Sequence, residues 1–255
     1  MASHPAMSLE GRTALVTGAG KGLGRAVALG LAKAGANVAL LARTRKDLAA
    51  VKAEVEALGR KASVEVADAT KSAAVDAAFA NTVVTFGKVD IVVHSAGGSL
   101  RKPSLQLTDA DWDGLIAANL TSTFIVNRAA GRLMTAQGSG SIINIASSAG
   151  LRGRPINAPY SAAKAGVINL TRALAMEWAS YGVRVNTIAP GRFLTPLTAA
   201  EMGDPAKYAA FVKQVPLGRI GRPEELEEIA VWLASEASAF VTGSVLVIDG
   251  GQTLL

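Results

Sequence analysis

The chain has 255 residues, of which half are hydrophobic, 18% are charged, 26 are glycine and none is cysteine. This composition is typical of a globular protein with a large core and excludes a disordered chain, while the lack of cysteine excludes disulfide and thiolate chemistry. The net charge of +6 comes from scattered basic residues. It indicates an ordinary basic surface, or an anionic cofactor or substrate, and we expect no nucleic-acid partner.

Signals for a membrane or for secretion are missing from the sequence. Its apolar stretches fall short of the roughly 18 to 20 residues that a membrane span needs. Residues 1–7 lack the basic segment followed by an apolar segment that marks a secretory signal. We therefore expect a cytoplasmic protein with no membrane partner and a frayed start, and we predict no metal site.

In chain order, short β-branched runs alternate with longer helical patterns, which predicts βαβ units around a parallel sheet. Helices are expected from Leu23 to a stop at Gly35 and over 49–58, 73–86, 111–134, 160–178 and 223–234. Strands are expected over 13–16, 37–41, 63–66, 89–93, 141–145, 183–188 and 245–248. The alternation predicts an α/β protein with a three-layer, doubly wound Rossmann fold and a seven-stranded parallel sheet.

One long interval, 190–221, carries no strand pattern. A compact domain seldom keeps about 30 residues of connection unless they form a lid or a binding segment. The sequence shows no repeat, low-complexity tract or linker. We therefore predict a single domain over 1–255, with 190–221 as a substrate-binding lid segment.

The stretch Thr17–Gly24, TGAGKGLG, lies between the first predicted strand and the first helix. Free N–H groups and the positive end of a helix dipole suit a phosphate at such a turn. The pattern G-x-G-x-x-G does not fit in register, whereas T-G-x-x-x-G-x-G fits with Gly18, Gly22 and Gly24 and leaves Gly20 as an extra. These glycines would permit a tight turn and close approach to a pyrophosphate; the alternative is a turn that only allows helix and strand to pack.

The end of the second predicted strand concerns the type of dinucleotide. A cofactor without a 2′-phosphate is usually held there by an acidic residue, but this strand is followed by Arg43 and Thr44. A guanidinium and a hydroxyl favour a phosphate monoester, and Lys21 adds a second cation. We therefore predict NADP(H); the alternative is that Arg43 is a solvated surface residue.

Tyr160 and Lys164 lie four residues apart, on one face of a predicted helix. A free tyrosine has a pKa of about 10, and lowering it by three units requires roughly 4 kcal/mol of differential stabilisation. A buried arrangement assisted by a cofactor could supply this. On its own, the pair is more often an ordinary helix surface.

The combination of these features resembles the short-chain dehydrogenase/reductase family over about residues 8–251. It rests on the glycine turn, Asn119, Ser147, the Tyr160 and Lys164 pair and the segment 186–191, NTIAPG, with further marks at Asp68, 95–97 and 249–251. The sequence departs from the family at His94 and Ser95, where two asparagines are usual. His94 is interpreted as a packed core residue.

The resemblance implies a catalytic tetrad of Asn119, Ser147, Tyr160 and Lys164. Tyr160 would be the general acid or base and Ser147 would bind the reacting oxygen. Lys164 would lower the pKa of Tyr160 and bind the nicotinamide ribose, and Asn119 would hold a water leading to Lys164. The expected NADP(H) contacts are Gly18, Gly20, Lys21, Gly22, Leu23, Gly24, Arg43, Thr44, Asp68, Ala69, Ser95, Ala96, Gly97, Tyr160, Lys164, Pro190, Gly191, Phe193 and Thr195.

The family resemblance also implies the class of substrate, a small carbonyl compound or alcohol. The chain is similar both to 3-oxoacyl thioester reductases and to sugar or polyol dehydrogenases. We expect a CoA-type 3-oxoacyl thioester or a related keto compound, with a sugar, polyol or keto-sugar acid as the alternative and a non-catalytic NADP(H) sensor as a remote one. Docking of an acidic carrier protein is not supported. The reductases that bind such a carrier usually do so through two arginines, and the matching positions here hold Gly138 and Tyr181.

Basic residues around the expected pocket, without an adjacent acid, would favour an anionic substrate; a merely solvated rim is the alternative. They are Arg101, Lys102, Arg152, Arg154 and Arg192. The family resemblance further implies a homotetramer, with helices 111–134 and 160–178 at one interface and the last strand at another.

Overall fold

The computed structural model describes residues 5–196, 198, 199 and 203–255, so residues 1–4 of the predicted frayed start lie outside it. Its parallel sheet has the strand order β3-β2-β1-β4-β5-β6-β7. The strands are β1 (Thr13–Thr17), β2 (Asn37–Ala42), β3 (Ala62–Val66), β4 (Ile91–His94), β5 (Gly140–Ile145), β6 (Val183–Pro190) and β7 (Val245–Ile248). The predicted seven-stranded parallel sheet is confirmed.

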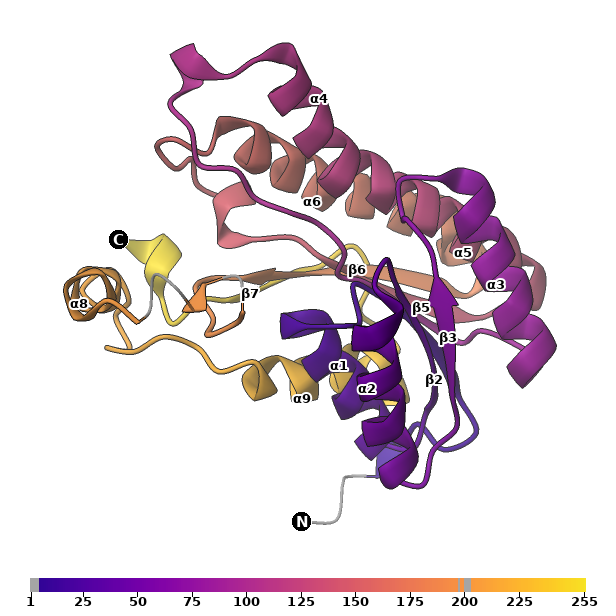
Figure 1. Ribbon diagram of the computed structural model, residues 1–255. Coiled ribbons are helices and arrows are strands. Elements are labelled where there is room, and N and C mark those ends of the chain that lie inside the picture. The colour runs from indigo at the N-terminus through magenta and orange to yellow at the C-terminus, as the bar shows by residue number, and fades with distance from the viewer. Residues whose placement is uncertain (1–4, 197, 200–202) are drawn as a thin grey trace.

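Helices cover both faces of this sheet (Figure 1). The helices are α1 (Gly22–Lys33), α2 (Arg45–Ala57), α3 (Ser72–Phe86), α4 (Asp109–Ile116), α5 (Ser122–Gln137), α6 (Ala158–Trp178), α8 (Pro205–Val212) and α9 (Glu224–Ala234). One buried cluster joins the sheet to α1, α2 and α9, and another joins it to α3, α5 and α6. The central strands are buried on both faces, which explains their continuous apolar runs.

The strand order reverses beside β1, whose neighbours are β2 and β4. In open parallel sheets, ligands bind beyond the carboxyl ends of the strands at such a reversal. The glycine turn, residues 95–97 and Ser147 all follow strands of this central region. The topology therefore places the predicted site residues together at the carboxyl ends of the strands.

The predicted helix 111–134 is one continuous helical run that contains a π-helix, η3 (Ala117–Thr121), between α4 and α5. It begins at a capping box, in which Thr108 accepts from the Asp111 backbone and the Asp111 side chain accepts from the Thr108 backbone. π-turns inside α-helices often occur at functional sites. Here the π-helix contains Asn119.

The interval 190–221 contains a helix that the strand and helix patterns did not reveal, α8. Asp204 caps it by accepting from the backbone of Ala206 and Lys207, and Pro205 is its first residue. An aspartate followed by a first-turn proline is a recognisable start signal. Within this interval, residues 197 and 200–202 lie outside the described chain.

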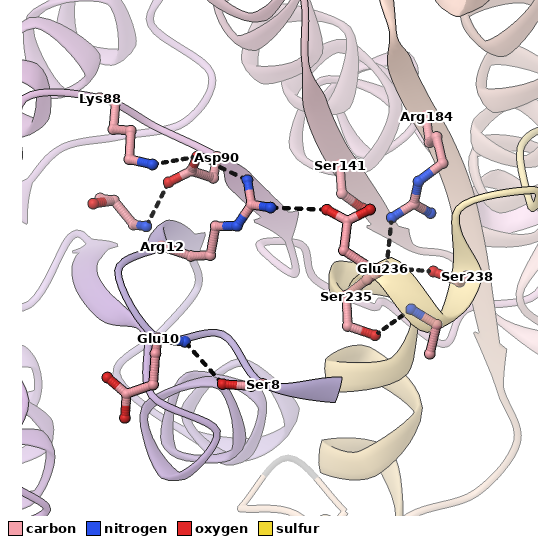
Figure 2. Close-up of polar contacts among 12 residues, drawn as sticks. Ser8, Glu10, Arg12, Lys88, Asp90, Ser141, Arg184, Ser235, Glu236 and Ser238 are labelled. Carbon is pink, nitrogen blue, oxygen red and sulfur yellow. Dashed lines mark hydrogen bonds and ion pairs between the residues drawn. The ribbon is translucent and has the colours of Figure 1, made fainter. Parts of the chain in front are cut away.

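At the amino ends of the strands, ion pairs and hydrogen bonds tie the strand starts to the end of α9 and to the 3-10 helix that follows it, η6 (Glu236–Ser238). Figure 2 shows Arg12 between Asp90 and Glu236, at 3.4 and 2.8 Å, with Lys88 3.0 Å from Asp90. Arg184 donates to backbone oxygens at the end of α9, including that of Leu233 at 2.8 Å. A hollow of about 520 Å³ opens here. Because its arginines are bonded to protein oxygens, we regard it as structural.

Candidate active site

The glycine turn leaves room that a side chain would fill. Gly18 has a φ of +66°, and a Cβ added there would lie 2.9 Å from the Ala96 backbone nitrogen. A Cβ on Gly24 would lie 2.3 Å from the Gly18 oxygen. Lys21, the N-cap of α1, makes no side-chain capping bond, so the first turn of α1 keeps free N–H groups. This cradle fits a dinucleotide pyrophosphate.

Two other residues of the turn have contacts within the protein. The Lys21 ammonium lies 3.0 Å from the Asp47 carboxylate, so its charge is already compensated. A Cβ on Gly20 would lie 3.0 Å from the Asp47 Cβ, and the extra glycine therefore lets the turn pack against α2. Leu23, in the first turn of α1, packs against the core cluster on that face.

The region after β2 and β3 fits a phosphate monoester. Arg43 is exposed directly after β2, and Thr44 is the N-cap of α2 without a side-chain capping bond. Asp68 accepts from the backbone and hydroxyl of Thr70, and these bonds, with smaller help from the Arg43 charge, hold its pKa below the usual value. Ala69 is buried beside it.

His94, at the end of β4, is buried as predicted, and it has partners that the sequence did not signal. Its Nδ1 lies 2.8 Å from the Thr17 hydroxyl and its Nε2 lies 3.2 Å from the Ser122 hydroxyl. Burial, with a smaller effect of Lys164, lowers its pKa to about 3. The Thr17 hydroxyl also accepts from the backbones of Ser95 and Ala96, so a neutral histidine ties β4 to β1 and to α5.

Asn119 is held inside the protein by the loop after β4. Its amide donates to the oxygens of Gly98 and Leu115, at 2.9 and 3.0 Å. A Cβ on Gly97 would lie 2.5 Å from the Asn119 Oδ1 and 3.7 Å from the Lys164 ammonium. The structure thus places Asn119 and Lys164 beside the same glycine.

Ser147, Tyr160 and Lys164 meet between β5 and α6. Pro159 lies in the first turn of α6, where a proline is tolerated, and it precedes Tyr160. Burial raises the pKa of the Tyr160 phenol, while a hydrogen bond with Ser147 and the charge of Arg154 act to lower it. Lys164 donates to the Ile145 oxygen at 2.9 Å, and its ammonium lies 5.6 Å from the centroid of the Tyr160 ring.

Lys164 is 5% exposed, and burial lowers its pKa to about 8. A positive charge in this place is therefore costly, even with the hydrogen bond to the Ile145 oxygen. Among the described residues, the cation whose charge acts to lower the pKa of Tyr160 is Arg154. This residue lies six positions before the tyrosine and was assigned from sequence only to a basic rim.

The segment after β6 returns over the glycine turn. A Cβ on Gly22 would lie 3.6 Å from the Thr195 Cβ, and one on Gly191 would lie 2.6 Å from the Asp249 Cβ. Phe193 is buried and bridges to Gly221. The predicted nicotinamide end of the site, which begins at Pro190, thus adjoins both the turn and the C-terminal segment.

The basic residues of the expected rim differ in the partners that they contact. Lys102 lies 2.7 Å from Asp111, so the expectation that no acid adjoins the rim is wrong at this position. The Arg192 guanidinium stacks 3.6 Å from the centroid of Phe211. Arg152 and Arg154 both contact Gln252. Sequence reasoning missed these partners because spacing alone does not show which side chains the folded chain brings together; Gln252 is about 100 positions from both arginines.

Comparisons with known proteins agree with this geometry. A family model described as Enoyl-(Acyl carrier protein) reductase matches residues 18–253. A gluconate 5-dehydrogenase of Gluconobacter oxydans is 41% identical over 99% of both chains. A 3-oxoacyl-[acyl-carrier-protein] reductase of Thermotoga maritima is 36% identical over 97% of this chain and 100% of its own.

Among solved structures, a gluconate 5-dehydrogenase from Burkholderia cenocepacia in complex with NADP and tartrate superimposes with a TM-score of 0.93. It is 39% identical and the match covers 98% of each chain. Within the described residues, no helix combines the length and apolarity needed to cross a bilayer. The chain belongs to the short-chain dehydrogenase/reductase family and is an oxidoreductase acting on CH–OH donors.

Proposed function

We propose that this enzyme uses NADP(H) to interconvert a hydroxyl and a carbonyl group of a sugar acid or polyol. The proposed reaction rests on one observation. Ser147, Tyr160 and Lys164 lie close together beside the cradle of the glycine turn. Support for the cofactor comes from Arg43 and Thr44, which stand where an acidic residue usually holds NAD(H), and from NADP in the Burkholderia relative.

The choice of substrate rests on several observations. The gluconate 5-dehydrogenase is more similar to this chain than the 3-oxoacyl reductase, at 41% against 36% identity. The two positions where a carrier-protein reductase has docking arginines hold Gly138 and Tyr181. The sugar or polyol alternative is therefore favoured over the thioester that we expected first.

In the proposed reaction, Tyr160 donates its phenol proton to the carbonyl oxygen during reduction and takes it back during oxidation. Ser147 holds that oxygen as charge develops on it. Lys164, buried with a lowered pKa, provides a charge that binding of ribose hydroxyls would stabilise, and Asn119 holds the adjoining loop in place. When bound, NADP(H) supplies or accepts the hydride.

The experiment is an absorbance assay of NADP⁺ reduction with D-gluconate, D-glucitol and galactitol, and of NADPH oxidation with acetoacetyl-CoA. We expect turnover of the sugar compounds, and Tyr160→Phe should lower kcat by about 100- to 10,000-fold while NADPH still binds. Turnover of acetoacetyl-CoA alone would overturn the proposed substrate class. An unchanged rate in Tyr160→Phe would overturn the mechanism and favour the sensor hypothesis.

The lid segment 190–221 and the homotetramer remain part of the proposal. Apolar side chains are exposed on the helices assigned to the first interface, with Met176 of α6 at 84% and Phe124 of α5 at 43%. Such exposed apolar groups are typical of contact surfaces when they gather in a patch. Light scattering should give about four times the 26.0 kDa chain mass, and a monomeric mass would contradict it.

A further inference from the structure

Arg154 is a half-buried arginine held in one place beside the candidate catalytic residues. Its Nη2 donates to the Ser148 hydroxyl at 3.0 Å and to the Gln252 Oε1 at 2.6 Å. Ser148 directly follows Ser147 in the chain, and the charge of Arg154 acts on Tyr160. The guanidinium is therefore fixed next to the place where the substrate oxygen would react.

Gln252 brings an amide to the same place. The residue is 3% exposed, and its Nε2 is buried without a hydrogen-bond partner among the residues that the structure describes. A buried donor without a hydrogen-bond partner destabilises the folded protein. An acceptor that arrives with a ligand would remove this cost.

The C-terminal segment is positioned by several bonds. Asp249 accepts from the backbones of Gly251 and Thr253, at 2.9 and 2.7 Å. Asp249 also packs on Gly191, at the predicted nicotinamide end of the site. Arg152 donates to the backbone oxygen of Gln252 at 3.1 Å. Gln252 is thus fixed between the loop that carries Arg154 and the cofactor region.

Charge gives a third, independent observation. Burial lowers the pKa of Arg154, and the nearby charges of Arg152 and Arg101 lower it further, against smaller opposing effects of Tyr160 and Asp249. The neighbouring Lys102 is compensated by Asp111. An anion would relieve this repulsion.

We propose that Arg154 and Gln252 form a carboxylate-binding subsite, which makes the enzyme select sugar acids over the corresponding polyols. A guanidinium and an amide N–H are the donors that suit the two oxygens of a carboxylate. The carboxylate binds at Arg154 while a hydroxyl further along the substrate chain reaches Ser147 and Tyr160. This inference rests on the proposed function and narrows its substrate class to open-chain sugar acids.

A matched pair of substrates tests the subsite. D-Glucitol is D-gluconate with the carboxylate replaced by a hydroxymethyl group, so the ratio of their kcat/KM values isolates the carboxylate. We expect the native enzyme to prefer gluconate, and Arg154→Met to lower the ratio by about 10- to 150-fold, the usual range for a charge-assisted hydrogen bond. The loss should lie mainly in KM, because the carboxylate stays bound throughout the reaction.

Two further variants make the test specific. Gln252→Met removes the amide at similar volume and should lower the ratio by about 2- to 12-fold. Lys102→Met removes a basic residue that Asp111 already compensates, and should leave the ratio within about twofold. Thermal unfolding and NADPH binding of each variant identify any loss of folding, and Arg154→Lys, which keeps the charge, should restore part of the ratio.

The outcomes separate the two proposals. An equal loss with both substrates in a folded Arg154→Met variant would overturn the subsite and give Arg154 a purely structural role, leaving the proposed function intact. A native enzyme with equal kcat/KM values for glucitol and gluconate would also overturn the subsite and leave the proposed function intact. If neither sugar compound reacts but acetoacetyl-CoA does, the proposed function fails and the subsite fails with it.

Discussion

Replacing Lys164 by methionine should make the folded protein more stable at neutral pH while abolishing turnover. The ammonium is 5% exposed, and its pKa falls from 10.5 to about 8. A lysine with a lowered folded-state pKa binds fewer protons in the folded than in the unfolded chain between these values, so stability rises with pH across that window. Burying the charge therefore costs about 3 kcal/mol at pH 7 and less than about 1 kcal/mol at pH 10.

The assay is urea unfolding of the native protein and Lys164→Met at pH 7 and pH 10, at one protein concentration and without cofactor. The methionine also removes the bond to the Ile145 oxygen, but that loss is present at both pH values and cancels in the comparison. The free-energy difference between the two proteins should shift by about 2.5 kcal/mol in favour of the native one from pH 7 to pH 10. A shift below about 1 kcal/mol would refute the reasoning, because it would mean that Lys164 is not a costly buried cation.

The cofactor prediction is tested by Arg43→Ala, which should weaken NADPH binding by about tenfold and leave NADH binding unchanged; a native preference for NADH would contradict it. Gly24→Ala should destabilise the protein by about 1 to 3 kcal/mol and weaken NADPH binding, because its Cβ meets the Gly18 oxygen, whereas Gly114→Ala, in open space on α4, should stabilise by about 0.5 to 1 kcal/mol. His94 has a pKa lowered from 6.5 to about 3, so it contributes stability that is present above pH 6.5 and lost as pH falls toward 3. Between pH 7 and pH 4, the free energy of unfolding in urea should therefore fall by about 3 kcal/mol less in His94→Asn than in the native protein. An equal fall in both proteins would count against a buried neutral histidine.

The strands and the glycine turn could be predicted because their signals are local. Apolar runs between helical patterns identify buried parallel strands, and the spacing of Gly18, Gly22 and Gly24 identifies the cradle. The charges on the surface could not be assigned in the same way. Lys21 and Lys102 were interpreted as free cations, yet they pair with Asp47 and Asp111, since long side chains reach partners that only the folded chain brings near.

The contacts of Arg154 in the candidate site could not be predicted from the sequence either. In the sequence it is one of several scattered arginines, and its distance from Gln252 is 98 positions. Its special character depends on burial, on Ser148 and on the C-terminal segment, and none of these follows from periodicity or spacing. The helix α8, by contrast, has a local start signal in the sequence, Asp204 followed by Pro205.

The π-helix at Ala117–Thr121 lies within one helical run, between α4 and α5. A π-turn amounts to one inserted residue, and each residue of an α-helix advances by about 100°. Because a π-helix takes up its extra residue in a wider turn, removing one residue there would restore a regular α-helix and leave α4 and α5 in nearly the same angular relation. The extra residue thus changes the helix only locally, at Asn119, so it could be gained or lost in evolution without rebuilding the interior.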